Sequence, residues 1–171
     1  MIGLFRDPFL VFIALFVWIG AAHESQSVQI KEAFAGIPIR AAMQKHFSTL
    51  TTNNTLQDAA KLILDGSQHD FPVMWGDRVM GILTRANLLA GLSQHGPDQL
   101  VTTVMQREFE TAEANEMLEA VLTRLATAPA RVIPVLQEGE LVGLVTAENL
   151  GEYLMIQNAL QRRKTATATR K

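Results

Sequence analysis

The stretch that decides the fold is Phe71-Pro72-Val73, followed by Gly81-Ile82-Leu83-Thr84-Arg85-Ala86-Asn87. It occurs a second time, as Ile133-Pro134-Val135 followed by Gly143-Leu144-Val145-Thr146-Ala147-Glu148-Asn149. Each residue of the second copy lies 62 positions after its counterpart in the first, and the register holds without a gap. Such a constant offset indicates an internal duplication, so the chain contains two related units.

The duplication extends beyond these stretches. We assign residues 37–96 to the first repeat and residues 97–160 to the second. Identical residues recur at the same 62-residue step, namely Met43, Gln44, Phe47, Thr49 and Leu56 in the first repeat and Met105, Gln106, Phe109, Thr111 and Leu118 in the second.

Each repeat is expected to begin with a short strand and an amphipathic helix. In the first repeat the strand lies near residues 47–51, and Asn54 is the expected N-cap of the helix, with Gln57 completing a capping box. Gly66 is expected to end this helix. Its apolar face follows helical spacing and consists of Leu56, Ala59, Ala60, Ile63 and Leu64.

A hairpin of two buried strands and a final helix complete each repeat. Thr84 and Thr146 follow the last strands and are expected to cap the closing helices. A unit of about 60 residues buries little core alone, so the two units should pack together with pseudo-twofold symmetry and a cleft on the axis. The strands are expected at 71–75 and 79–83, joined by Gly76-Asp77, and at 131–137 and 140–145, joined by Glu138-Gly139.

Composition excludes several classes of protein. The chain has 171 residues and a net charge of −2, and 48% of its residues are hydrophobic. The near-neutral balance argues against a nucleic-acid partner, which would need a basic face. There is no cysteine, so disulfides, thiolate metal sites and a cysteine nucleophile are excluded.

The apolar excess lies at the N-terminus, where residues 9–22 are apolar throughout. Counted from Met1, the segment is long enough for a transmembrane helix over residues 1–22, followed by a linker over 23–36. A cleaved signal peptide and a buried helix of a soluble protein are the alternatives. At the other end, residues 161–171 form a basic tail that we expect to be disordered, either solvated or in contact with anionic lipid headgroups.

The repeats resemble cystathionine-β-synthase (CBS) domains. The shared signature is an apolar-Pro-Val strand, then Gly-apolar-apolar-Thr/Ser-x-x-Asp at the start of a helix, and it covers 71–87 and 133–149. The resemblance implies an α+β fold with two β-α-β-β-α repeats, which here would follow one N-terminal transmembrane helix. It also implies homodimers and an adenine nucleotide, such as AMP, ADP or ATP, bound in the cleft between the repeats.

In this resemblance the ligand-binding positions fall on the two signature stretches. Thr84 and Thr146 lie at helix N-termini, where free backbone N–H groups favour a phosphate. The resemblance places ribose contacts at Asn87 and Asn149, although the family usually has Asp there, and the loss of charge weakens such a contact. The remaining expected ligand contacts are Phe71, Val73, Ile133 and Val135.

The two expected half-sites differ in charge. Glu148 lies beside the phosphate position of the second repeat and would repel a polyphosphate. The first repeat has Arg85 and Ala86 there, so we favour the half-site built on Thr84. Because threonine and asparagine are also ordinary cap residues, a structural module without a ligand remains the alternative.

Residues 7–22 resemble the last membrane helix of site-2-protease-like zinc metalloproteases, a group in which a CBS pair can follow that helix. The resemblance implies a membrane-embedded protease domain as partner. The catalytic chemistry is missing from this sequence. His23-Glu24 is not followed by the second histidine of H-E-x-x-H, and Leu64-Asp65-Gly66 is better explained as a helix end. The four histidines (His23, His46, His69 and His95) show no metal-ligand spacing.

Three functions follow from this reading. We favour a membrane-tethered regulatory CBS pair that senses an adenine nucleotide, or only dimerises, and that regulates a zinc metalloprotease domain. This hypothesis places the chain in the membrane, with the CBS module in the cytoplasm and the lipid bilayer as a partner. The alternatives are a C-terminal piece of a site-2-protease-like metallopeptidase and an exported CBS pair without a ligand. In each case this chain alone is not expected to be an enzyme.

Overall fold

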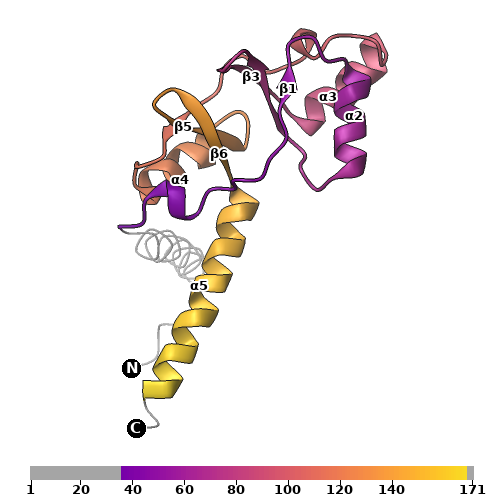
Figure 1. The fold of residues 1–171 in the computed structure, drawn as a ribbon. Coiled ribbons are helices and arrows are strands. Elements are labelled where there is room, and N and C mark those ends of the chain that lie inside the picture. The colour runs from indigo at the N-terminus through magenta and orange to yellow at the C-terminus, as the bar shows by residue number, and fades with distance from the viewer. Residues whose placement is uncertain (1–35, 169–171) are drawn as a thin grey trace, which may run out of the picture. The chain divides into compact units, whose positions relative to one another are not determined.

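Each repeat folds as a strand, a helix, a β-hairpin and a closing helix in the computed structural model, which describes residues 36–168 (Figure 1). This order confirms the α+β prediction. The first repeat contains β1 (Leu50–Thr51), α2 (Leu56–Asp65), β2 (Phe71–Trp75), β3 (Arg78–Leu83) and α3 (Arg85–His95). The second contains β4 (Ala112–Glu113), α4 (Leu118–Thr127), β5 (Val132–Gln137), β6 (Glu140–Thr146) and α5 (Ala147–Ala168).

The strands form two small sheets with the same topology. In one sheet the order is β1-β2-β3, and in the other it is β4-β5-β6. The first pair of each sheet is parallel and the second is antiparallel. A register shift falls between Val73 and Met74 in β2 and between Val135 and Leu136 in β5, which are equivalent positions. The duplication is therefore preserved down to an irregularity within a strand.

The hairpin turns lie where the sequence predicts them, at residues 76–77 and 138–139. Gly76 adopts a φ of 58°, and Glu138 and Gly139 adopt φ values of 54° and 85°. In the second hairpin both central residues have positive φ, the geometry of a type I′ turn, which matches the twist of the flanking strands. The second hairpin thus tolerates a non-glycine residue in the left-handed region to keep this geometry.

The predicted N-cap of the first long helix is wrong by one residue. Thr55 caps α2, because its hydroxyl accepts the N–H of Asp58 and the Asp58 carboxylate accepts the N–H of Thr55, a reciprocal capping box. Asn54 instead accepts the N–H of Thr51 and closes the turn after β1. Leu64, predicted on the buried face of this helix, is 84% exposed because it lies beyond the stripe that contacts the core.

The segment that leads into each repeat pairs with the other repeat. Gln44 exchanges two backbone hydrogen bonds with Leu144 in β6, at 2.8 and 3.0 Å. Gln106, the residue 62 positions after Gln44, exchanges two with Ile82 in β3, at 2.8 and 2.9 Å. The 3₁₀ helices η1 (Ile39–Ala41) and η2 (Val101–Thr103) lie in these leading segments. The reciprocal exchange is the pseudo-twofold relation that the duplication predicts.

Side chains from both repeats share one buried cluster. Ile82 in β3 packs with Ala130, Val132 and Leu144 of the second repeat, and all four are buried. A second cluster belongs to the first repeat and includes Val101 and Met105 from the segment that leads into the second. The two repeats therefore depend on each other for their cores, as expected for units of about 60 residues.

The final helix is longer than the sequence suggests. α5 starts directly after β6 and runs to Ala168, so the expectation of a disordered tail from residue 161 does not hold for residues 161–168 (Figure 1). Among the helices of residues 36–168, none combines the length and apolar character needed to cross a bilayer. The predicted transmembrane helix over 1–22 and the linker up to residue 35 lie outside the described residues.

Candidate functional site

The two predicted helix caps are present at the closing helices. The hydroxyl of Thr84 accepts the backbone N–H of Asn87 at 3.2 Å and caps α3. The hydroxyl of Thr146 accepts the backbone N–H of Asn149 at 3.1 Å at the start of α5. Both threonines are half-buried. The equivalent geometry confirms the caps, and the surroundings of the two helix starts decide what each can bind.

At the start of α3 the polar groups already have partners within the protein. The backbone N–H of Arg85, which a phosphate would need, donates to the carboxylate of Asp70 at 3.0 Å. The side-chain amide of Asn87, predicted to hold a ribose, donates to the carbonyl of Val104 at 2.9 Å. The sequence favours the half-site on Thr84, but in the structure the groups that would bind a ligand there are hydrogen-bonded to other parts of the protein.

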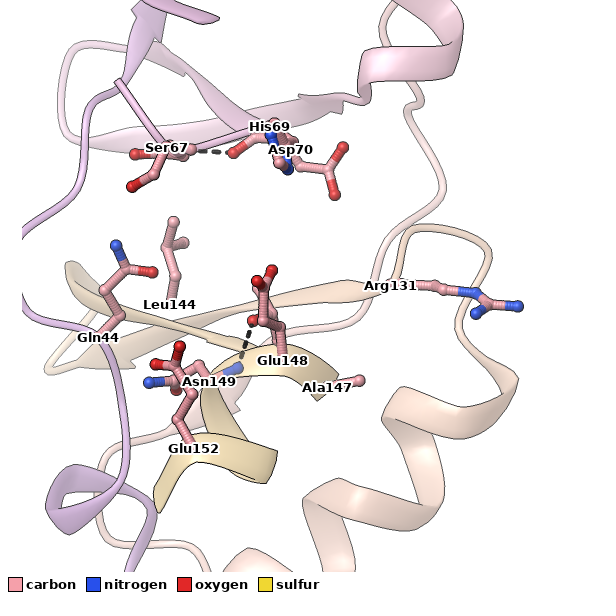
Figure 2. Close-up of a pocket in the computed structure, with 12 residues that line it drawn as sticks. Gln44, Ser67, His69, Asp70, Arg131, Leu144, Ala147, Glu148, Asn149 and Glu152 are labelled. Atoms are coloured by element: carbon pink, nitrogen blue, oxygen red, sulfur yellow. Dashed lines mark hydrogen bonds between the residues drawn. The ribbon is translucent and has the colours of Figure 1, made fainter. Parts of the chain in front are cut away.

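The start of α5 borders a cavity of about 530 Å³ between the two repeats (Figure 2). Thr146, Asn149 and Leu144 line it from the second repeat. The loop of residues 67–70, which precedes β2, lines it from the first, together with Gln44. A volume of this size suits a small-molecule ligand. The cavity thus combines one capped helix start with a loop of the opposite repeat.

The apolar residues of the two Pro-Val strands lie in the core. Phe71, Val73, Ile133 and Val135 are at most 1% exposed, so the structure places their side chains within the hydrophobic interior. Phe71 also borders a second cavity of about 480 Å³, which shares residues of the 67–68 loop with the first. Of the eight predicted positions, Thr146 and Asn149 line the first cavity and Phe71 lines the second.

A glutamine holds the loop between the two cavities. The side-chain oxygen of Gln68 accepts the N–H of Ser48 at 2.7 Å, and its nitrogen donates to the carbonyl of Ser48 at 2.9 Å. The same nitrogen donates to the carbonyl of Asp70 at 2.8 Å. An amide side chain here replaces a pair of backbone hydrogen bonds. This contact sets the position of Asp70 and His69 on the wall of the cavity.

The cavity contains four charged residues, of which the sequence pointed only to Glu148. Asp70, Glu148 and Glu152 supply three carboxylates, and Arg131 supplies one guanidinium. His69 lies 62 positions before Arg131, so the two occupy equivalent places in the two repeats. The 62-residue offset was therefore the feature of the sequence from which both residues could have been identified as part of the site. Asn149 adds a side-chain oxygen that is buried and has no hydrogen-bond partner.

Comparison with known proteins identifies the family. The family model for the CBS domain matches residues 39–94 and again residues 101–156. The chain belongs to the CBS-domain family. The two matches stand 62 residues apart, like the repeats themselves. CBS pairs are generally regulatory and non-catalytic, and they commonly dimerise.

Solved CBS pairs share the fold at low sequence identity. An AcuB acetoin utilization protein from Vibrio cholerae superposes with a TM-score of 0.66 and 21% identity, over 74% of this chain and 96% of that one. The CBS pair of protein MJ0100 superposes with a TM-score of 0.60 and 19% identity, over 70% and 97%. That structure contains 5′-methylthioadenosine and S-adenosyl-L-methionine.

Curated relatives are mostly longer proteins. Homoserine O-acetyltransferase from Methanococcus vannielii is 24% identical over 67% of this chain and 24% of its own length. Rip3 from Mycobacterium tuberculosis, named as a zinc metalloprotease, is 26% identical over 98% of this chain and 44% of its own length. The chain therefore spans less than half the length of either relative.

Proposed function

We propose that this CBS pair is a regulatory module that binds an adenosine-containing ligand in the cavity at the start of α5. The observation that supports this proposal is a cavity of about 530 Å³ formed by both repeats beside a threonine-capped helix start. A related fold, that of MJ0100, contains two adenosyl compounds. A ligand that touches both repeats stabilises their packed arrangement by mass action, and this coupling is the physical basis of regulation.

The first test measures binding to the full 171-residue chain. Adenosine, AMP, ADP and ATP are each added up to millimolar concentration, and the unfolding temperature and the heat of titration are recorded. Guanosine serves as the matched control for non-specific stacking. A rise in unfolding temperature with adenosine compounds and none with guanosine supports the proposal. Absence of both heat and stabilisation for every adenosine compound refutes it.

The regulated partner, in our proposal, is a membrane-embedded zinc protease domain. The match to Rip3 covers 98% of the chain, whereas the match to homoserine O-acetyltransferase covers 67%. The similarity to the protease thus includes residues ahead of the CBS pair, where the sequence predicts a membrane helix. In this arrangement the helix tethers the module to the bilayer on the cytoplasmic side, and ligand binding biases the protease.

A chimera tests this partnership. The chain replaces the matching part of Rip3, and cleavage of a membrane substrate is measured with and without adenosine. A ligand-dependent change in cleavage that disappears when the cavity is altered supports the proposal. Equal cleavage in all conditions, with the chimera present in the membrane, contradicts it.

We also propose that the module forms a homodimer through its repeats. Leu64 in α2 and Leu89 in α3 are 84% and 58% exposed, and these two helices contact each other. In this proposal the two leucines belong to one apolar patch, the kind of surface through which proteins associate. Sedimentation of the wild-type chain and of Leu64→Glu tests this idea, and a wild-type monomer at all concentrations would contradict it.

A further inference from the structure

Both closing helices carry a carboxylate of this chain at their positive ends. The carboxylate of Asp70 accepts the first free N–H of α3, that of Arg85, at 3.0 Å. Glu148 lies in the first turn of α5. A helix N-terminus attracts one negative charge to its free N–H groups. Here the protein supplies that charge itself, by two different routes, at the two places where a nucleotide phosphate would otherwise bind.

The same two carboxylates line the cavity. Figure 2 shows Glu148 directed into the space below the loop of Ser67 and His69, whereas the side chain of Arg131 extends away from it. Three carboxylates and one guanidinium leave the walls with two negative charges when His69 is neutral. Lys45 borders the adjacent cavity and does not line this one. A phosphate placed here would face like charge, which opposes binding.

The uncharged part of the cavity suits the rest of an adenosine compound. Leu144 provides an apolar wall, and Gln44 and Ser67 provide polar groups. The buried side-chain oxygen of Asn149 has no hydrogen-bond partner. That oxygen is closed to solvent, so a ribose hydroxyl could donate to it only after the Asn149 side chain turned toward the cavity. A buried polar atom without a partner is unfavourable, which favours such a turn when an uncharged donor is present.

We propose that the cavity selects adenosine compounds that have no phosphate at the 5′ position, and that Glu148 and Asp70 impose this selection. This inference rests on the proposed function, and it specifies the ligand as a neutral or cationic nucleoside derivative. Glu148 excludes a phosphate from the start of α5, and Asp70 adds a negative charge on the part of the cavity wall that the first repeat contributes. A cationic group at the 5′ position would be attracted to the same carboxylates.

The experiment compares four probes with the full-length chain by isothermal titration and thermal shift. Adenosine is neutral, S-adenosylmethionine has a positively charged sulfonium, and AMP and ATP carry increasing negative charge. We expect adenosine and S-adenosylmethionine to bind at least about tenfold more tightly than AMP, a difference of about 1.4 kcal/mol. ATP should bind more weakly than AMP. The preference for S-adenosylmethionine should decrease as salt is added.

Two variants test the assigned residues. Glu148→Gln and Asp70→Asn each keep the shape of the side chain and remove its charge, so AMP should bind about tenfold more tightly to either variant while adenosine changes little. Glu108→Gln is the matched control, because Glu108 is exposed and does not line the cavity. The unfolding temperature of each variant without ligand verifies that it is folded.

The outcomes separate the inference from the proposed function. If AMP or ATP binds the wild-type chain more tightly than adenosine, the charge selection is wrong and the ligand cavity stands. If no adenosine compound binds the wild-type chain or either variant, the proposed function itself is wrong. If the preference for adenosine persists in both variants, Glu148 and Asp70 do not impose it, and the assignment of these residues is overturned.

Discussion

Replacing Gly81 by alanine tests the exchange of leading segments between the repeats. Gly81 lies in β3, and a Cβ atom added there would stand 2.7 Å from the carbonyl oxygen of Gln106 and 2.9 Å from Sδ of Met105. The carbonyl belongs to the backbone that pairs with Ile82, so it cannot move without disturbing two hydrogen bonds of 2.8 and 2.9 Å. We therefore expect Gly81→Ala to lower the free energy of unfolding through weakened hydrogen bonds as well as through local crowding.

The magnitude follows from three contributions. Overpacking a tight site costs about 1–3 kcal/mol. Weakening the two bridging hydrogen bonds adds about 1 kcal/mol for each bond that is lost. Replacing glycine by alanine restricts the unfolded chain and returns about 0.4–1 kcal/mol. We expect a net destabilisation of about 2–4 kcal/mol for Gly81→Ala, equivalent to roughly 4–16 °C in unfolding temperature at about 2–4 °C per kcal/mol.

The pseudo-equivalent Gly143 provides an internal comparison. An added Cβ there would lie 2.5 Å from Sδ of Met43, but 3.2 Å from the carbonyl of Gln44. A methionine side chain is flexible and can move aside, so Gly143→Ala should cost about 0–1 kcal/mol after the unfolded-state gain. Gly151→Ala in α5 is the control, since nothing lies within 4 Å of its Cβ position, and it should stabilise the chain by up to about 1 kcal/mol.

Urea unfolding followed by circular dichroism measures all three variants. A stability of Gly81→Ala within about 0.5 kcal/mol of wild type, the range typical of surface substitutions, would refute this prediction. A larger destabilisation by Gly143→Ala than by Gly81→Ala would refute it too. In either case the passage of the Gln106 backbone against β3 would not be the reason for glycine at this position.

Three further predictions concern the caps and the loop. Thr55→Ala removes the N-cap of α2 and should lower the free energy of unfolding by about 1 kcal/mol, measured in urea. The pKa of Asp58 is lowered from 3.8, first by the hydrogen bond from the backbone N–H of Thr55 and then by the side chain of Asn54. The ionised carboxylate of Asp58 therefore stabilises the fold fully above pH 3.8, and this stabilisation is lost as the pH falls through the lowered pKa. Asp58→Asn should lose less stability than wild type when both are unfolded in acid. Gln68→Ala removes both side-chain contacts to Ser48 and should speed amide hydrogen exchange at Ser48, with no change at residues of β5.

Much of the fold was predictable because it depends on patterns within a single element. The apolar runs around Phe71 and Ile133 and the turn residues at 76–77 and 138–139 specify the hairpins to within one or two residues. The crossing of the leading segments was not predictable in this way. Periodicity reports which face of an element is buried, and it carries no information about which repeat a loop pairs with. The recurrence of Met43-Gln44 at residues 105–106 was visible, but its cause was not.

The candidate site was predictable only in part, for a related reason. Thr84 and Thr146 follow from the local chemistry of helix caps. The role of Asp70 depends on the hairpin register, in which Phe71 pairs with Leu83, so that the residue before β2 lies beside the residues after β3. Predicting this contact requires the residue pairing of the β2–β3 hairpin, and not only the prediction that a hairpin forms. A sequence argument that carried the register through would place Asp70 beside Arg85.

The two repeats differ in charge at the starts of their closing helices, and this difference is informative about function. The threonine caps of the closing helices, the strand irregularities and the reciprocal bridges are all kept at the 62-residue offset. The carboxylates are not, because the residue 62 positions after Asp70 is Val132, a buried residue of β5, and the residue 62 positions before Glu148 is Ala86. Each repeat thus has a carboxylate near the start of its closing helix, but the loop before β2 supplies it in the first repeat and α5 itself supplies it in the second. A symmetric scaffold with an unsymmetric arrangement of charge would present two unlike half-sites to a ligand, and we expect binding at one ligand per chain in the titrations.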